Sequence, residues 1–156
     1  MRYCYKMYEI GIDGQYAPGV AKIFKPDVSD DEEELTKAYF DEAMTQTVAD
    51  SFARQFNHRL PETHKTLQCR FLPVQVLHLT DQGHTLCNAE PYLSGQYMKH
   101  NDNDGHVESD LELPQAFSHF TWEASNQSLL VCDIQGVGNY YTDPQIHSHD
   151  GEGFVM

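Results

Sequence analysis

The chain has 156 residues and a mass of 17.9 kDa, enough for one compact domain and too little for two full ones. Hydrophobic residues make up 40% and aromatic residues 12%, so the chain can bury a core and is not of the disordered class. The net charge of −14 disfavours binding to nucleic acid or to an anionic membrane. The sequence contains no long apolar run and no secretory signal, and we therefore expect a soluble, cytoplasmic protein.

The cysteines are few and widely spaced, and they match neither a Cys-x-x-Cys metal or redox motif nor a dense disulfide framework. There are four of them: Cys4, Cys69, Cys87 and Cys132. This spacing predicts reduced thiols, which agrees with a cytoplasmic location.

Two strands are expected at the start of the chain, over residues 2–10 and 20–24, where aromatic and apolar residues mix with single charges. Asp13 and Gly14 between them form a typical turn signal. The pattern predicts a β-hairpin.

A long amphipathic helix is expected next. Ser29, with Glu32 three residues later, forms a capping box that predicts the start of the helix. Apolar residues then recur at three- and four-residue steps to about Asn57, and Pro61 lies just beyond.

The rest of the chain predicts a second pair of strands, a short helix, a buried strand and a final loop, over residues 69–79 and 84–93, 114–123, 128–134 and 136–156. The polar stretch 100–105 resembles a calcium-binding loop. With Gly105 at the sixth position, however, His100 and Leu111 occupy positions that need carboxylates, so turn chemistry explains the stretch better. The order of elements predicts an α+β fold.

Three oxygen-bearing side chains follow the buried strand. Asp133 ends it, Gln135 lies on the same side of an extended chain, and Asp143 follows ten residues after Asp133, beyond a glycine-containing turn. Two carboxylates and an amide oxygen are hard ligands of the kind Mg²⁺ accepts. The alternative, that Asp133 only caps the strand or forms a turn, stays open at this point.

Other candidates are weaker taken one by one. Lys22, inside a short strand, could contact a phosphate, but strand lysines more often point into water. His147 and His149 would point the same way in an extended chain, yet no cysteine follows at ligand spacing. His119 lies among aromatic residues, and we expect it to be semi-buried rather than a ligand.

Longer strings carry more information than these single residues. The sequence contains the strings EPYLSGQYMKHN (90–101), QAFSHFT (115–121), VCDIQGVG (131–138) and TDPQIHS (142–148), preceded by MRYCYKM (1–7), VAKI (20–23) and ARQFN (53–57). In order and approximate spacing they resemble the alpha-kinase family. The resemblance spans nearly the whole chain.

The resemblance implies a two-lobed, atypical protein-kinase-like fold. Residues 1–90 would form an N-terminal lobe with the long helix, and residues 91–156 part of a C-terminal lobe with the catalytic loop. ATP and Mg²⁺ would bind between the hairpin-helix part and the later sheet. The activity implied is transfer of the γ-phosphoryl group of ATP to Ser or Thr of a protein. The candidate substrates are a translation elongation factor and a myosin-like helical segment.

The resemblance also implies a role for each matching residue. Lys22 would contact an ATP phosphate, and Glu90 would lie at the adenine. Asp133 would be the catalytic carboxylate. Mg²⁺ would be held by Gln135 and Asp143, and His119 would be one ligand of a structural Zn²⁺.

One departure from the family pattern affects the zinc site. Alpha-kinases continue into a glycine-rich segment and then a histidine and two cysteines that complete this site, whereas the present chain diverges after His147. The three remaining ligands have no counterpart, so we expect a domain truncated at its C-terminus that binds zinc poorly. The alternative to an active kinase is an inactive fragment that binds nucleotide or serves as a protein-interaction module.

Overall fold

A computed structural model gives the fold of the chain and describes residues 1–26, 31–83, 85–108 and 111–151. It mixes helices with antiparallel and parallel strands, which confirms the predicted α+β class. The chain divides into two compact units, Met1–Met44 with Pro73–Tyr92 and Thr45–Leu72 with Leu93–Met156. Among the described residues, no helix is long and apolar enough to span a membrane.

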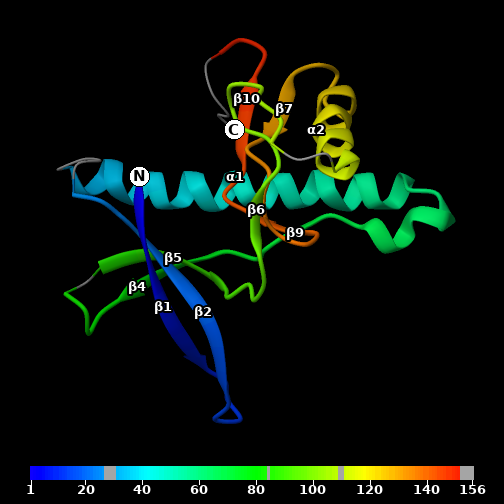
Figure 1. The fold of residues 1–156 in the computed structure, drawn as a ribbon. Helices are drawn as coiled ribbons and strands as arrows, with labels where there is room; N and C mark the ends of the chain where they lie inside the picture. Colours follow the sequence, from blue (N-terminus) through cyan, green and yellow to red (C-terminus); the bar gives the residue numbers. More distant parts are fainter. Residues whose placement is uncertain (27–30, 84, 109–110, 152–156) are drawn as a thin grey trace. The chain divides into compact units, whose positions relative to one another are not determined.

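The first unit is built on a four-stranded antiparallel sheet (Figure 1). Its strand order is β1-β2-β5-β4, with bounds Arg2–Ile10, Tyr16–Phe24, Thr85–Pro91 and Gln75–Leu79. The predicted hairpin is confirmed, because β1 pairs with β2 over its whole length and Gly14 takes the left-handed conformation (φ 75°) that the turn requires. The hairpin extends well past the part of β2 that pairs with β5, residues 19–22.

The long helix α1 runs over Glu32–Arg59 and contributes residues to both units. Its predicted cap residue, Ser29, lies outside the described residues. The structure shows a different cap, since the Asp31 carboxylate accepts the backbone N–H groups of Glu33 (2.8 Å) and Glu34 (3.2 Å). Within the first unit, Tyr39 of α1 is buried edge-on against Phe24, with ring centroids 4.7 Å apart.

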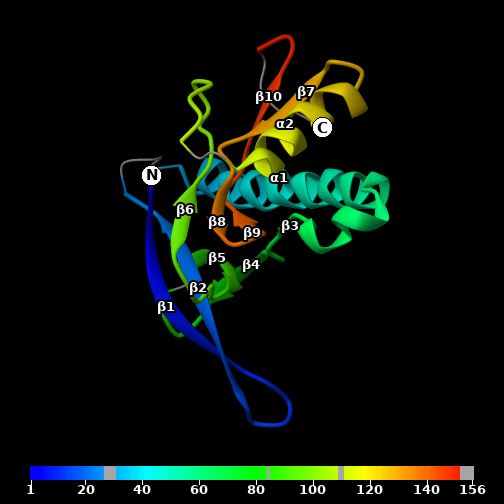
Figure 2. The ribbon, with the colours of Figure 1, turned by 45° about the vertical axis from the view of Figure 1, so that its right-hand side comes forward.

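The second unit contains the later part of α1, a second α-helix and two small sheets (Figure 2). Helix α2 (Glu112–Ala124) packs along β7 (Leu129–Cys132), which pairs antiparallel with β10 (Gln145–Ser148). The other sheet has the order β3-β9-β8-β6, with bounds Arg70–Phe71, Tyr140–Thr142, Gln135–Val137 and Tyr97–Lys99. A 3-10 helix, η1 (Glu62–Leu67), follows α1.

An aromatic core holds the second unit together. Phe117 of α2 is fully buried and contacts Phe56 of α1 and Phe71 of β3, with ring centroids 5.8 and 5.6 Å apart. Phe71 in turn packs on Tyr141 of β9. Residues 45–72 therefore belong to the second compact unit; the lobe boundary near residue 90 that the resemblance implies stays a prediction.

Two predicted elements are wrong. The stretch 69–79 is two strands, β3 and β4, rather than one, and Pro73, which has no N–H for a sheet ladder, lies between them. The expected final loop instead contains β8, β9 and β10, which are only three or four residues long. Helix α2, β5 and β7 agree with the prediction, apart from small shifts of their ends and from His84, which lies outside the described residues.

Candidate active site

Asp133 is held at a sharp bend between β7 and β8. It is 9% exposed, and its backbone has a φ of 57°, a strained value for a residue with a side chain. Lys99 of β6 places its Nζ atom 2.6 Å from Asp133 Oδ1, and this contact raises the pKa of Lys99. A strained, buried carboxylate with a fixed cation is an arrangement typical of functional sites.

The structure brings the three predicted oxygen-bearing residues together. Gln135 donates from Nε2 to Asp133 Oδ2 (3.1 Å) and to the backbone oxygen of Asp143 (3.3 Å). Asp143 also has a positive φ, 52°, and its side chain is partly exposed. These hard oxygen donors fit Mg²⁺ chemically.

Close backbone packing keeps the β8–β9 hairpin beside this group. A Cβ atom on Gly136 would lie 2.0 Å from the backbone oxygen of Tyr140, so only glycine fits. Gly136 pairs with Tyr141 across the hairpin, which fixes Gln135 opposite Thr142. The approach of Gln135 to Asp143 therefore depends on a glycine between them in the chain.

A buried amide fixes the backbone next to Asp133. Asn101 is 6% exposed, and its Oδ1 accepts the N–H of Ile134 at 2.9 Å. Its Nδ2 donates to Gln115 Oε1 (2.9 Å) and Ser118 Oγ (3.2 Å) of α2. The position of Asp133 is thus tied to α2 through one side chain.

The first unit contains a second buried polar group. Lys22 of β2 and Glu90 of β5 form an ion pair of 2.7 Å, with side chains only 6% and 3% exposed. The alternative that Lys22 points into water is wrong, because Glu90 supplies the charge that makes burial tolerable. Asn88 lies directly opposite Lys22, is 1% exposed, and its Oδ1 has no hydrogen-bond partner among the described residues. An unsatisfied buried acceptor beside a cation is typical of a site that binds a polar ligand.

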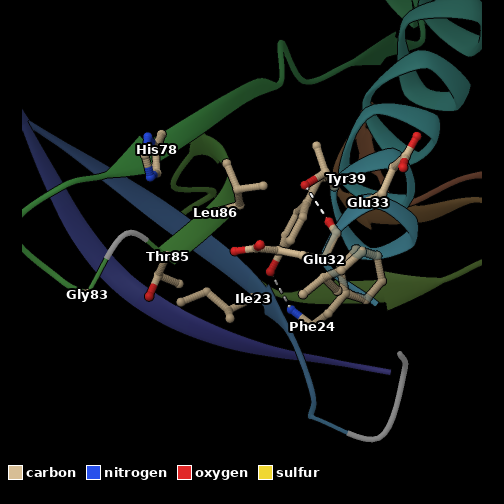
Figure 3. A pocket seen from close by; sticks show the side chains of 11 residues that line it. Ile23, Phe24, Glu32, Glu33, Tyr39, His78, Gly83, Thr85 and Leu86 are labelled. Carbon is tan, nitrogen blue, oxygen red and sulfur yellow. Dashed lines mark hydrogen bonds between the residues drawn. The ribbon is translucent and has the colours of Figure 1, made fainter. Parts of the chain in front are cut away.

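The first unit also has a hollow of about 890 Å³, which is lined by neither Lys22 nor Glu90 (Figure 3). Phe24 and Leu86 contribute apolar surface, and Glu32 and Glu33 at the start of α1 contribute negative charge. Glutamates repel phosphates, and Lys22 does not line the hollow. We therefore do not assign nucleotide to it.

The three histidines singled out from the sequence are exposed. His119 is exposed on α2, not semi-buried as predicted, because the opposite side of the helix carries Phe117 into the core. His147 and His149 are exposed as well. Among the described residues, no group of three or more His, Cys, Asp or Glu side chains could hold a metal ion. The described residues therefore do not fit the implied zinc site.

Sequence reasoning missed several residues of these two sites. Lys99 and Asn101 lie inside the string 90–101, so the string itself was the available signal. Gln46 of α1, which accepts the N–H of Asp143 at 2.9 Å, and the buried Asn88 gave no local signal.

Comparison with known proteins decides the family. The model of the alpha-kinase family matches residues 1–156. The chain belongs to the alpha-kinase family. Alpha-protein kinase 1 of Dictyostelium discoideum is 41% identical over 156 residues, which are 99% of this chain and 11% of that protein. Myosin heavy chain kinase C of the same organism is 46% identical over 120 residues, 75% of this chain and 15% of that protein.

Solved alpha-kinase domains have the same fold. The crystal structure of the alpha-kinase domain of myosin heavy chain kinase A in complex with ADP superimposes with a TM-score of 0.79 and 37% identity, covering 92% of this chain and 56% of that chain. Rat elongation factor 2 kinase is 42% identical over 119 residues, 74% of this chain and 16% of that protein. Within the family, the strings quoted from the sequence predict a closer relation to elongation factor 2 kinase than to the myosin heavy chain kinases. Both kinds of kinase are among the relatives, and this ranking stays a prediction. The chain spans less than a fifth of these full-length relatives.

Proposed function

We propose that the chain is the ATP-binding and catalytic part of an atypical protein serine/threonine kinase. The observation that carries the proposal is the group formed by Lys99, Asp133, Gln135 and Asp143 in a chain of the alpha-kinase family. Phosphoryl transfer needs positioned groups and charge neutralisation more than covalent chemistry from the protein. A few fixed charges at a strained bend meet that need.

Lys22 and Glu90 are the proposed ATP contacts of the first unit. The Lys22 ammonium group would contact a phosphate, and Glu90 would lie at the adenine and hold Lys22 in place through their 2.7 Å ion pair. The orphaned Oδ1 of Asn88 on the same sheet face supports a polar ligand there. The relative solved with ADP supports a nucleotide as that ligand.

Asp133 is the proposed catalytic carboxylate of the second unit. The hydroxyl oxygen of the acceptor Ser or Thr would form a bond to the γ-phosphorus as the bond to the leaving ADP oxygen breaks, and the hydroxyl proton would pass to Asp133. Lys99 and Gln135 hold the two oxygens of this carboxylate in place. Gln135 and Asp143 would hold Mg²⁺, which when bound neutralises charge on the phosphates.

The acceptor is proposed to be a protein. The names of the relatives point to myosin heavy chains and elongation factor 2 as substrates of those kinases, so a helical myosin-like segment and a translation elongation factor are the candidates to test. We also propose a cytoplasmic location, because all four cysteines are free thiols, three of them buried.

The test is transfer of radiolabelled γ-phosphate from ATP to a Thr-containing helical peptide. Asp133→Asn keeps the shape of the side chain and removes its charge, and the rate should fall by about 10²–10⁴-fold, the usual contribution of a general base. Asp104→Asn, at an exposed loop aspartate, is the matched control and should transfer at the native rate. An Asp133→Asn variant as fast as the native chain would show that Asp133 is misassigned, and a native chain that transfers nothing would support the inactive module instead.

A further inference from the structure

The parallel pairing of β3 with β9 stops one hydrogen bond early. Arg70 N donates to Asn139 O and Leu72 N donates to Tyr141 O, both at 2.9 Å. In a parallel ladder the next bond would join the N–H of Asp143 to the carbonyl oxygen of Leu72.

The side-chain amide of Gln46 stands in the place of that bond. Gln46 of α1 is 3% exposed, its Nε2 donates to Leu72 O at 2.8 Å, and its Oε1 accepts the N–H of Asp143 at 2.9 Å. One amide therefore satisfies both backbone groups that the ladder would have paired. It lies between the two segments that continue β3 and β9 and keeps them from pairing directly at this point.

This insertion accounts for the backbone of Asp143. Released from the ladder, Asp143 turns into the left-handed region (φ 52°), and its carbonyl oxygen accepts Nε2 of Gln135 at 3.3 Å. Its N–H is held by Gln46 on one side and its C=O by Gln135 on the other. With both backbone groups held, the direction of the Cα–Cβ bond of Asp143 is fixed, which limits where its carboxylate can lie.

We infer that Gln46 is a positioning residue that sets the metal-binding geometry of Asp143 from within helix α1. The inference rests on the proposed role of Asp143 as a Mg²⁺ ligand. Gln46 itself acts through the backbone of Asp143. Residues that orient metal ligands in this way commonly change metal affinity by 10- to 100-fold when they are replaced.

Helix α1 offers a matched control. Asn57 is also a bridging amide, with Nδ2 donating to Cys69 O at 2.7 Å and Oδ1 accepting the N–H of Cys69 at 3.1 Å. It therefore makes the same kind of bonds from the same helix, but to a backbone segment that does not include Asp143.

The experiment is calorimetric titration of the chain with Mn²⁺ADP, which reports metal-nucleotide binding without any phosphoryl transfer. Gln46→Met fills a similar volume and removes both bonds, and the Kd should rise at least about tenfold. Asn57→Leu should stay within about threefold of the native chain, even though its loss of stability in urea unfolding is comparable to that of Gln46→Met.

Equal Kd values for Gln46→Met and the native chain would overturn the inference and leave the proposed function intact. A native chain that does not bind Mn²⁺ADP would overturn both. A second test uses the native chain alone, so it does not depend on whether a variant folds. Hydrogen exchange of the Asp143 amide should be slowed by its bond to the buried Gln46. Exchange at the unprotected rate would also overturn the inference.

Discussion

Replacing Lys22 or Glu90 singly should be far more costly than replacing both. The two charges are 2.7 Å apart and nearly fully buried. At an effective dielectric constant of about 20 their attraction is about 6 kcal/mol, which offsets the cost of removing them from water. Lys22→Met leaves the Glu90 carboxylate buried without its cation, and we expect a loss of about 3–5 kcal/mol in the free energy of unfolding.

The double variant Lys22→Met/Glu90→Met distinguishes the pair from its parts. It replaces two buried charges by apolar groups of similar length, a change that is often neutral in free energy. The expected loss is therefore about 0–1 kcal/mol, and the coupling energy between the two sites is several kcal/mol.

The assay is urea unfolding of the native chain, the two single variants and the double variant. The exposed pair Lys37 and Asp41, 2.6 Å apart with side chains 74% and 61% exposed, serves as the control cycle. Its coupling should be about 0.3–0.5 kcal/mol, as for other exposed helical pairs four residues apart. Additive losses at Lys22 and Glu90 would refute the reasoning, because they would mean that neither charge depends on the other.

Three further predictions concern stability and reactivity. Phe117→Ala should lower the free energy of unfolding by about 3–5 kcal/mol in urea unfolding, since Phe117 is fully buried, whereas Phe40→Ala at a 56% exposed position should cost under about 0.5 kcal/mol; similar losses would contradict the aromatic core. Burial raises the pKa of Cys69 to about 12 and of Cys132 to about 11, so at pH 8 Ellman's reagent should label the exposed Cys4 quickly and the three buried thiols only after unfolding; four equal rates would disprove this. Burial also lowers the pKa of His100 below 6.5. Between the lowered pKa and pH 6.5, His100 is therefore protonated in the unfolded chain and neutral in the folded chain. The stabilisation is complete above pH 6.5 and is lost as pH falls through the lower folded pKa, by up to about 1.4 kcal/mol per pH unit; urea unfolding at pH 7.5, 6.5 and 5.5 should show this slope, and a His100→Gln variant with an undiminished slope would refute it.

The sequence correctly predicted the elements that depend on residues close together in the chain. The hairpin turn at Asp13 and Gly14 and the periodic apolar residues of α1 involve only neighbours in the chain, and both are present. The sequence also predicted that Gln135 lies near Asp133, and the contact is present; the reason given for it, two-residue alternation in an extended chain, does not apply, because Asp133 lies at a bend with a φ of 57°.

Long-range partners explain what the sequence did not reveal. Lys22 is buried because Glu90, 68 positions away, neutralises its charge. The alternation of residues within one strand cannot predict a partner on another strand. Gln46 reaches Asp143 across 97 positions. The strands β8 to β10 are too short for a recognisable alternation, and their ladders are the evidence for them.

The most direct test of the account is calorimetric titration of the chain with ATP in the presence of Mg²⁺, which measures nucleotide binding separately from phosphoryl transfer. The native chain should bind, and Lys22→Ala should weaken binding by about 1.5–3 kcal/mol, or roughly 10- to 150-fold. Asp133→Asn, although its transfer rate falls by about 10²–10⁴-fold, should bind with nearly native affinity. Native affinity in Lys22→Ala would remove Lys22 from the site. A native chain that shows no binding of ATP would contradict the central claim.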